Sequence, residues 1–454
     1  MPRRKKLREE RSGKDLEECA KLQYNYWQKD EAQLMTSRTF TRKYQPVNAI
    51  VHAQPIEFFV AGSPHYYIDL SSSTIRVRAR IVTPAGAVAG AGDHVSTCNL
   101  TINSMFGDIL FELGGKLLNQ NTNGLYPYRA YLETLLSINE ETKEKFFPIE
   151  CWYKDTPAQI GQVDPNAAAG DRNRGLFARM TRFGGNIVEM VFRPHLDLFH
   201  QELSIPPNVS LHLILHQARD AFVLKTDRLY GGGQTLYRMD IMECVFSVVT
   251  SEVFRSIEES HIGMLYSGNN IRIKYDKVEI KQLAIPAGQA NHHFEGVFKG
   301  VLPERVFIAL VEQQAKDGHY QQNPFNFQHN NQSHIALFIN NVIHNGYAIE
   351  PDYRAASVSY ADAYLTLYQA MGRDYKNQSV GIGFEEYNQG FTIYGFDLTP
   401  DGSADFCPNL PREGEIRLDF GFRVAPANPL TAVIYSQGCG ELQIEANGEV
   451  IVVQ

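Results

Sequence analysis

The sequence lacks the features that mark a membrane protein or a secreted protein. No apolar run approaches the ~20 residues that a membrane-spanning helix needs. The first residues are polar and basic with no apolar stretch behind them, so we expect no secretory signal. The six cysteines lie far apart and form no Cys-x-x-Cys pair, which predicts reduced thiols. We therefore expect an intracellular protein, in the cytoplasm or nucleus, that is not secreted.

Motifs of the common enzyme classes are also missing. There is no Gly-x-Ser-x-Gly elbow, and Gly114-Gly115-Lys116 lacks the other residues of a phosphate loop. Gly381-x-Gly383 has no strand-to-helix context. No His-x-His occurs, although a cupin-type metalloenzyme normally carries that pair. We predict no catalytic residues, no metal and no cofactor; the adjacent acids Glu385-Glu386 leave a glycosidase-type pair open, with surface acids as the simpler interpretation.

Two histidine pairs are candidate metal ligands by their spacing alone. His212 and His216 are four apart in an alternating, strand-like run, which places them roughly 13 Å apart on one face. Zinc bonds to histidine are about 2.0–2.1 Å long, so this separation is too large for one ion. His292-His293 are adjacent, so on a strand their side chains point to opposite faces. Both pairs are interpreted as sheet residues.

Two stretches, one in each half of the chain, follow the same plan. Asp108–Asn119 reads DILFELGGKLLN and His334–Asn345 reads HIALFINNVIHN. In each, a short apolar run meets two residues that tolerate positive φ, Gly114-Gly115 or Asn340-Asn341, as a tight hairpin turn requires. The recurrence predicts one β domain built twice.

Short alternating strands separated by long loops fill most of the remaining sequence. Thr74–Val82 places apolar residues on one face and three arginines on the other, namely Arg76, Arg78 and Arg80. This row is interpreted as a solvated or interface face, with phosphate or carboxylate binding as the alternative. Many strands and few helices favour a sandwich or barrel. We predict an all-β fold of two tandem eight-stranded jelly-roll β-sandwiches, with short helices in the loops (128–136 and 361–371) and an N-terminal helical arm; periodicity alone leaves an immunoglobulin-like sandwich open.

The N-terminus differs in charge from the rest of the chain. Residues 1–14 hold seven Lys or Arg and two Glu, whereas the whole chain has a net charge of −8. Asp15–Leu34 is helix-like, because apolar residues recur at spacings of three and four, at Leu16, Ala20, Tyr24 and Trp27. We expect a basic arm and helix over 1–48, a first jelly roll over 49–230 and a second over 231–454, with Gly231–Gly233 at the boundary.

The basic arm is the candidate contact for nucleic acid or the inner face of a shell. Lysine and arginine neutralise phosphates and release counterions, so such binding weakens with salt. A solubilising tail is the alternative. The candidate residues are Arg3, Arg4, Lys5, Lys6, Arg8, Arg11 and Lys14.

Seven segments carry a family resemblance through their order and spacing together: PIEFFVAGS (Pro55–Ser63), YYIDL (Tyr66–Leu70), LYPYRAYLETLL (Leu125–Leu136), CWYKDT (Cys151–Thr156), LPER (Leu302–Arg305), NPFNFQH (Asn323–His329) and YGFDLTPD (Tyr394–Asp401). On these segments the chain resembles the double jelly-roll major capsid proteins of the adenovirus-hexon lineage, in particular the versions carried by Maverick/Polinton elements and adintoviruses. The likeness runs from about Pro55 to the C-terminus and does not include the basic arm.

This resemblance implies a structural, hexon-type capsid protein rather than an enzyme. Three chains with two jelly rolls each form a pseudo-hexagonal homotrimer that tiles the icosahedral shell of a virion. The implied partners are other copies of the chain and a minor penton protein. DNA contact at the basic arm is a separate hypothesis, because the arm is not part of the likeness. The aromatic segments Phe147–Tyr153 and Pro324–Phe327 are expected to supply contacts between copies. Leu229-Tyr230-Gly231-Gly232 resembles the sites cut by adenovirus-type maturation proteases, although a flexible interdomain turn is the simpler interpretation.

Two other functions stay open at this point. The first is a carbohydrate-binding or glycan-processing double jelly-roll protein, which predicts a secretory signal, disulfides or acidic calcium-binding loops. The second is a domesticated cellular copy of a capsid gene. The native mass separates the first from a capsid protein, because the capsid interpretation predicts a trimer of 51.3 kDa chains or a larger shell.

Overall fold

A computed structural model of the chain describes residues 33–119, 122–228, 237–354, 359–400, 402 and 409–453. The basic arm, nearly all of the expected N-terminal helix, and Gly231–Gly233 lie outside these residues. Among the helices that are described, none combines the length and the apolar character needed to cross a membrane.

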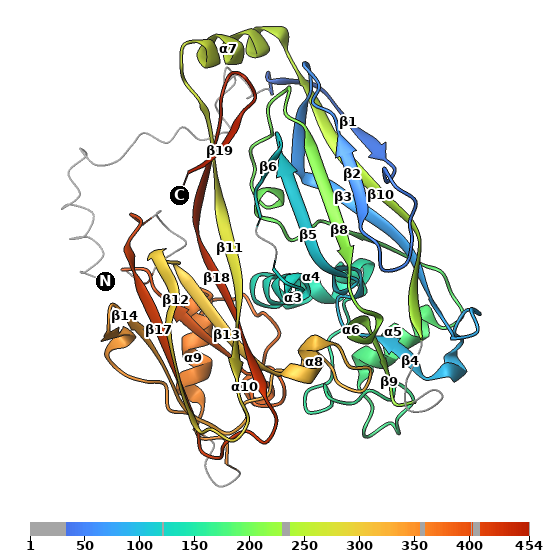
Figure 1. Cartoon of the computed structure of the whole chain (residues 1–454), viewed down its shortest axis with the longest axis vertical. Coiled ribbons are helices and arrows are strands. Elements are labelled where there is room, and N and C mark those ends of the chain that lie inside the picture. Colours follow the sequence, from blue (N-terminus) through green and yellow to red (C-terminus); the bar gives the residue numbers. More distant parts are fainter. Residues whose placement is uncertain are drawn as a thin grey trace, which may run out of the picture.

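The first sandwich consists of two four-stranded antiparallel sheets (Figure 1). The strand order is β1-β10-β3-β7 in one sheet and β2-β8-β5-β6 in the other. A small two-stranded sheet pairs β4 (Val95–Thr97) with β9 (Leu224–Thr226). The principal strands are β1 Thr36–Tyr44, β2 Ile56–Val60, β3 Tyr67–Val82, β5 Phe106–Leu113, β6 Lys116–Leu117, β7 Val188–Phe192, β8 Leu211–Gln217 and β10 Arg238–Val253.

The second sandwich stands beside the first and is built in the same way (Figure 1). Its sheets have the orders β11-β18-β13-β16 and β12-β17-β14-β15, and β19 (Val450–Val453) adds to the end of β18. The principal strands are β11 Ile271–Ile285, β12 Asn291–Val301, β13 Arg305–Glu312, β14 Gln332–Ile339, β15 Val342–Ile343, β16 Ile393–Asp397, β17 Glu413–Phe422 and β18 Leu430–Ile444.

The two sandwiches have the same topology. When the eight principal strands of each are counted in chain order, one sheet has the order 1-8-3-6 and the other 2-7-4-5, in both halves. This order is that of a jelly roll and not of an immunoglobulin-like sandwich. Within the described residues, the predicted all-β class and twin jelly rolls are therefore confirmed.

The two predicted hairpins occupy equivalent places in the two halves. β5 turns into β6 at Gly114 and Gly115, whose φ values are 57° and 76°. β14 turns into β15 at Asn340 and Asn341, with φ values of 49° and 64°. These left-handed conformations suit glycine and asparagine, which explains why these residue pairs mark the turns. A helix follows each hairpin, as predicted: α3 (Tyr126–Ser137) and α9 (Ala361–Ala370).

Burial on β3 follows the alternation in its sequence. Ile75, Val77 and Ala79 have no exposed surface and form part of the core. The three arginines on the other face make ion pairs with acids of the neighbouring strands: Arg76 with Glu243 (2.6 Å) and Glu189 (3.3 Å), Arg78 with Glu243 (3.4 Å), and Arg80 with Asp240 (2.8 Å). The arginine row is thus a partly exposed strand face neutralised within the chain.

The expected boundary between the two halves differs from the strand pairing. β10 was assigned to the second half by the boundary at 231, yet it pairs with β1 and β3 of the first sandwich. We propose that the halves divide after Val253, and that β1 belongs to the first sandwich rather than to the arm.

The remaining helices lie in the connections between strands. α7 crosses from the first sandwich to the second at one end of the molecule, and α3 with α4 lies between the sandwiches (Figure 1). The bounds are α2 Thr101–Ser104, α4 Glu140–Lys145, α5 Arg174–Phe183, α6 Asp220–Val223, α7 Arg255–Tyr266, α8 Gln313–Asp317 and α10 Phe384–Tyr387.

Candidate functional site: the junction between the sandwiches

The two sandwiches meet around α3, which packs against β5 of the first and β18 of the second (Figure 1). The turn between β18 and β19 also reaches the first sandwich. A Cβ atom added at Gly114 would lie 3.0 Å from a Val450 methyl group and 3.1 Å from the Gly448 carbonyl oxygen. The β5–β6 turn therefore requires glycine both for its backbone conformation and for this close approach.

An aromatic cluster forms the apolar part of the junction. Phe325 and Phe327, from the loop before β14, insert among aromatic side chains of the first sandwich. The Phe325 ring stacks on Tyr131 with centroids 4.2 Å apart and planes at 3°. It also meets Tyr128 edge-on at 5.6 Å. Both phenylalanines are fully buried, so the prediction that this segment contacts other copies is wrong: it joins the two halves of one chain.

Two buried lysines of the first sandwich donate hydrogen bonds to carbonyl groups of the second. Lys143 Nζ lies 2.6 Å from the Val380 oxygen, and Lys225 Nζ lies 2.9 Å from the His319 oxygen. Burial lowers the pKa of each ammonium group to about 7. Each ammonium also donates to a carbonyl of its own sandwich, so these hydrogen bonds partly replace the lost hydration. These hydrogen bonds join the two sandwiches, although burying each ammonium group costs hydration free energy.

An ionic network lies at the side of α3 that faces β18. Arg129 donates to Glu133 (Nε–Oε1, 3.0 Å) and to Asp197 (Nη2–Oδ1, 2.5 Å). His195 Nδ1 lies 2.6 Å from Glu133 Oε2, and the Tyr435 hydroxyl of the second sandwich lies 3.4 Å from Glu133 Oε1. Burial raises the pKa of Glu133, but Arg129 and His195 outweigh burial and hold this pKa well below its ordinary value. The carboxylate is therefore ionised and paired.

Glu133, His195 and His200 also have the spacing of a metal site, since one ligand atom of each lies within 4.8 Å of the others. The surroundings favour an ion pair instead. The guanidinium of Arg129 already binds Glu133, and a second positive charge beside it is unfavourable. Burial lowers the pKa of His200 to about 3, so this ring is neutral and takes no part in the ion pair. The charge of Arg129, and not the state of His200, is what disfavours a metal here. Another such group in the described residues is His94, Asp164 and Asp227.

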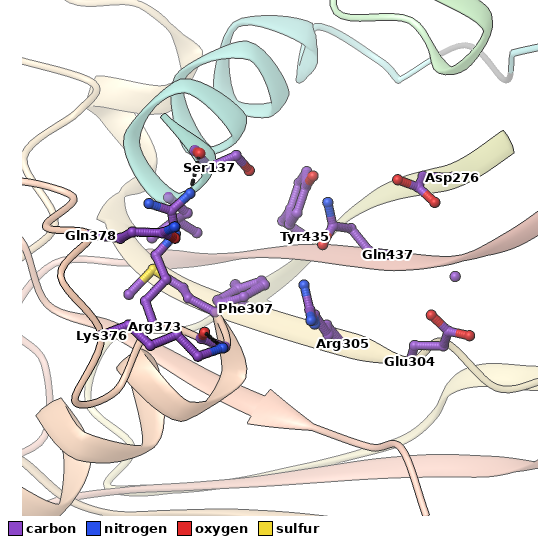
Figure 2. Close-up of a pocket in the computed structure, with 14 residues that line it drawn as sticks. Ser137, Asp276, Glu304, Arg305, Phe307, Arg373, Lys376, Gln378, Tyr435 and Gln437 are labelled. Atoms are coloured by element: carbon purple, nitrogen blue, oxygen red, sulfur yellow. Dashed lines mark hydrogen bonds between the residues drawn. The ribbon is translucent and has the colours of Figure 1, made fainter. Parts of the chain in front are cut away.

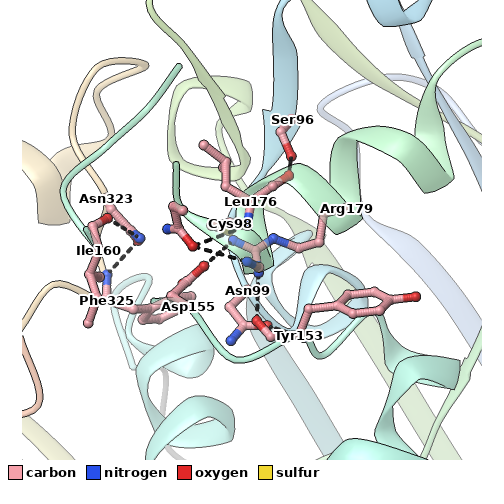
Figure 3. A network of polar contacts seen from close by, with 12 residues as sticks. Ser96, Cys98, Asn99, Tyr153, Asp155, Ile160, Leu176, Arg179, Asn323 and Phe325 are labelled. Carbon is pink, nitrogen blue, oxygen red and sulfur yellow. Dashed lines mark hydrogen bonds and ion pairs between the residues drawn. The ribbon is translucent and has the colours of Figure 1, made fainter. Parts of the chain in front are cut away.

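A second buried ion pair fixes the long connection between α4 and α5 (residues 146–173), which we call the α4–α5 insertion. Figure 3 shows the Arg179 guanidinium between Asp155 and the backbone of Tyr153, at 2.7 Å and 2.9 Å. Both charged side chains are essentially without exposed surface, and a buried pair is tolerated only when such hydrogen bonds accompany it. The same insertion reaches the second sandwich, where Asn323 Nδ2 donates to the Ile160 oxygen at 2.9 Å.

A cavity of about 490 Å³ opens beside the end of α3 (Figure 2). Arg373, from the segment after α9, spans its edge and donates to Asn139 at 2.5 Å and to the Ser137 carbonyl. Burial, with Asp276 and Asp397, raises the pKa of Glu304 against the opposing effect of Arg305. Most of the lining is polar, whereas small-molecule pockets are lined mainly by apolar and aromatic side chains. The cavity is interpreted as part of the seam between the sandwiches.

The candidate residues from the sequence analysis that the structure describes lie on separate elements and do not form one site. Arg3, Arg4, Lys5, Lys6, Arg8, Arg11 and Lys14 lie outside the described residues. His212 and His216 lie on β8 as predicted, and His212 is 3.2 Å from Glu112. His292 is buried on β12 while His293 is exposed. Glu386 pairs with Lys154 at 2.7 Å across the junction. The junction network itself was missed, because its members carry no motif and meet only through the fold.

Comparisons with known proteins agree with this architecture. No family model matches the chain. The uncharacterized protein F54H12.2 of Caenorhabditis elegans is 20% identical over 401 residues, which span 86% of this chain and 91% of the relative. The match covers most of both chains, but the name of this relative states no activity.

Solved structures of similar fold come from viruses. The structure of the Sputnik virophage matches with a TM-score of 0.62 and 10% identity, covering 97% of this chain and 93% of that one. The PBCV-1 virus capsid matches with a TM-score of 0.55 and 10% identity over 94% and 99% of the two chains. The mavirus major capsid protein matches with a TM-score of 0.51 and 12% identity over 97% and 95%. At these identities the likeness shows the fold, which is the double jelly roll of these proteins.

Proposed function

We propose that the chain is a structural major capsid protein that assembles into homotrimers and tiles an icosahedral shell. The observation that carries this proposal is the identical strand order of the two sandwiches, held side by side by a buried junction. Three copies of such a block supply six similar domains, which suits a pseudo-hexagonal tile. The full-length match to the mavirus major capsid protein and the PBCV-1 capsid supports the same function.

The role proposed is architectural, not enzymatic, and the place of action is the virion after assembly inside a host cell. The proposed partners are further copies of the chain, a minor penton protein, and DNA through the seven basic residues of the arm. A relative in a nematode fits the integrated, Polinton-type element that the sequence resemblance implies. The comparisons give no support to the carbohydrate-binding alternative.

The oligomeric state tests the proposal. Light scattering on the purified full chain should give a mass near three times 51.3 kDa, or a larger shell. Trimers need large buried interfaces, typically more than ~2,000 Å², so the trimer should persist on dilution. A stable monomer at micromolar concentration would contradict the proposal.

A further inference from the structure

α7 is a helix with an exposed apolar face. None of its twelve residues is buried. Polar contacts fix one side to the start of β3: His261 Nδ1 lies 2.8 Å from the Tyr67 hydroxyl, and Glu258 lies 3.4 Å from His65. Figure 1 shows the helix at the end of the molecule, beyond the tips of the strands. The helix is therefore held in place while its other faces are uncovered.

Large apolar side chains gather on and beside this helix. Ile262 and Tyr266, one turn apart, share one side. The chain also enters the described structure here, because the Phe254 amide donates to the Met35 oxygen at 3.1 Å. We call these residues the α7 surface; their exposed fractions are 73% for Leu34, 55% for Met35, 47% for Phe254, 44% for Ile262, 56% for Met264 and 81% for Tyr266.

An apolar face of this kind indicates a partner, since soluble proteins rarely expose clustered large apolar side chains. The chain has a candidate in the segment that directly precedes Leu34. Its sequence predicts an amphipathic helix with Leu16, Ala20, Tyr24 and Trp27 on one face.

The directions of the two helices also fit. Gln33 and Leu34 are not helical, and Met35 lies beside Phe254, where α7 begins. A helix that ends at residue 32 can therefore run antiparallel to α7. At a rise of 1.5 Å per residue, the segment 15–32 is about 27 Å long and the twelve residues of α7 about 18 Å, so the half of the segment that carries Tyr24 and Trp27 would lie along α7 and its first residues would extend past Tyr266.

We propose that the amphipathic segment 15–32 packs in cis on the α7 surface. Its apolar face covers Ile262 and Tyr266, whereas Met264, two residues from each, lies on another side of α7. The basic residues 3–14 then project beyond the Tyr266 end of α7. With this contact, the basic residues 3–14 start from a fixed position on the molecule. It depends on the sandwich fold and on no assumption about shell assembly.

Trp27 provides a direct probe, because the chain has only one other tryptophan, the buried Trp152. The fluorescence of wild type minus that of Trp27→Phe isolates the Trp27 signal, and the remaining Trp152 emission reports whether each variant is folded. The proposal predicts a blue-shifted Trp27 signal that acrylamide quenches poorly. Ile262→Glu combined with Tyr266→Glu should shift this signal to the red and raise quenching several-fold.

A matched pair of changes elsewhere serves as the control. Val342→Glu with Tyr347→Glu alters two exposed apolar residues near the β14–β15 hairpin and should leave the Trp27 signal unchanged. A solvent-exposed Trp27 in wild type overturns the proposal, as does a shielded Trp27 that ignores the α7 changes. If dilution exposes Trp27 and also lowers the mass of the particle, the segment packs on α7 of a neighbouring copy, and the cis arrangement is overturned.

Discussion

Phe325 of the second sandwich lies flat against Tyr131 of the first, with ring centroids 4.2 Å apart. This stack lies where the two jelly rolls meet, between residues far apart in the sequence. A contact of this kind makes the pair of sandwiches one block, because separating them exposes both rings to water.

Truncating this ring should weaken the whole chain. Phe325→Ala leaves a cavity among Tyr131, Tyr128 and Phe222, and large-to-small changes of buried phenylalanine cost about 3–5 kcal/mol. Denaturant unfolding of the full chain measures the loss. Tyr375→Ala is the control, since Tyr375 is 99% exposed and its loss should change stability by less than ~0.5 kcal/mol.

Lys225 should make stability rise with pH. Burial lowers its pKa to about 7, whereas the unfolded value is near 10.5. Between these values the unfolded chain binds more protons than the folded chain, so this contribution to stability grows as pH rises from 7 and is lost as pH falls through 7. The slope contributed is at most ~1.4 kcal/mol per pH unit.

Lys225→Met should remove this contribution. Stability curves at pH 7, 8 and 9 should be flatter for the variant than for wild type. Lys145→Met, a change of an exposed lysine, should keep the wild-type slope. Equal slopes for wild type and Lys225→Met would show that Lys225 stays protonated in the folded chain up to pH 9, which would contradict the lowered pKa.

Gly114→Val should destabilise both the hairpin and the junction. The φ of Gly114 is 57°, which costs a non-glycine residue about 1–3 kcal/mol, and the added atoms meet Val450 and Gly448. The melting temperature and the protection of β18–β19 amides from hydrogen exchange should both fall. Gly92→Ala, at a site with open space and no positive φ, should leave both unchanged.

Changing the seven basic residues of the arm to glutamine should weaken binding to duplex DNA at low salt. Each lost phosphate contact lowers the slope of log K against log salt by about 0.9. Arg78→Gln, at an arginine already paired with Glu243, should bind DNA as wild type does. Unchanged affinity and slope in the arm variant would remove DNA from the proposed partners.

Local signals made much of the fold predictable. Gly114-Gly115 and Asn340-Asn341 marked the hairpins because few other residues adopt positive φ. The alternation in β3 gave its buried face correctly. The membership of β10 was not predictable in this way, since its pairing with β1 and β3 depends on residues about 160 to 215 positions away.

The candidate site was less predictable than the fold. Aromatic richness drew attention to Pro324–Phe327, but composition does not distinguish an interface between copies from one within a chain. Arg129, Glu133 and His195 look unremarkable in sequence because their chemistry comes from burial and from one another. The α7 surface likewise has no motif and is visible only as exposure on a folded helix.

Electron microscopy of the purified full-length protein tests the central claim most directly. The account predicts particles with a six-lobed, pseudo-hexagonal outline formed by three chains of two sandwiches each, alone or packed in shells. Particles of two lobes, corresponding to single chains at all concentrations, or rings with any other number of lobes would contradict it.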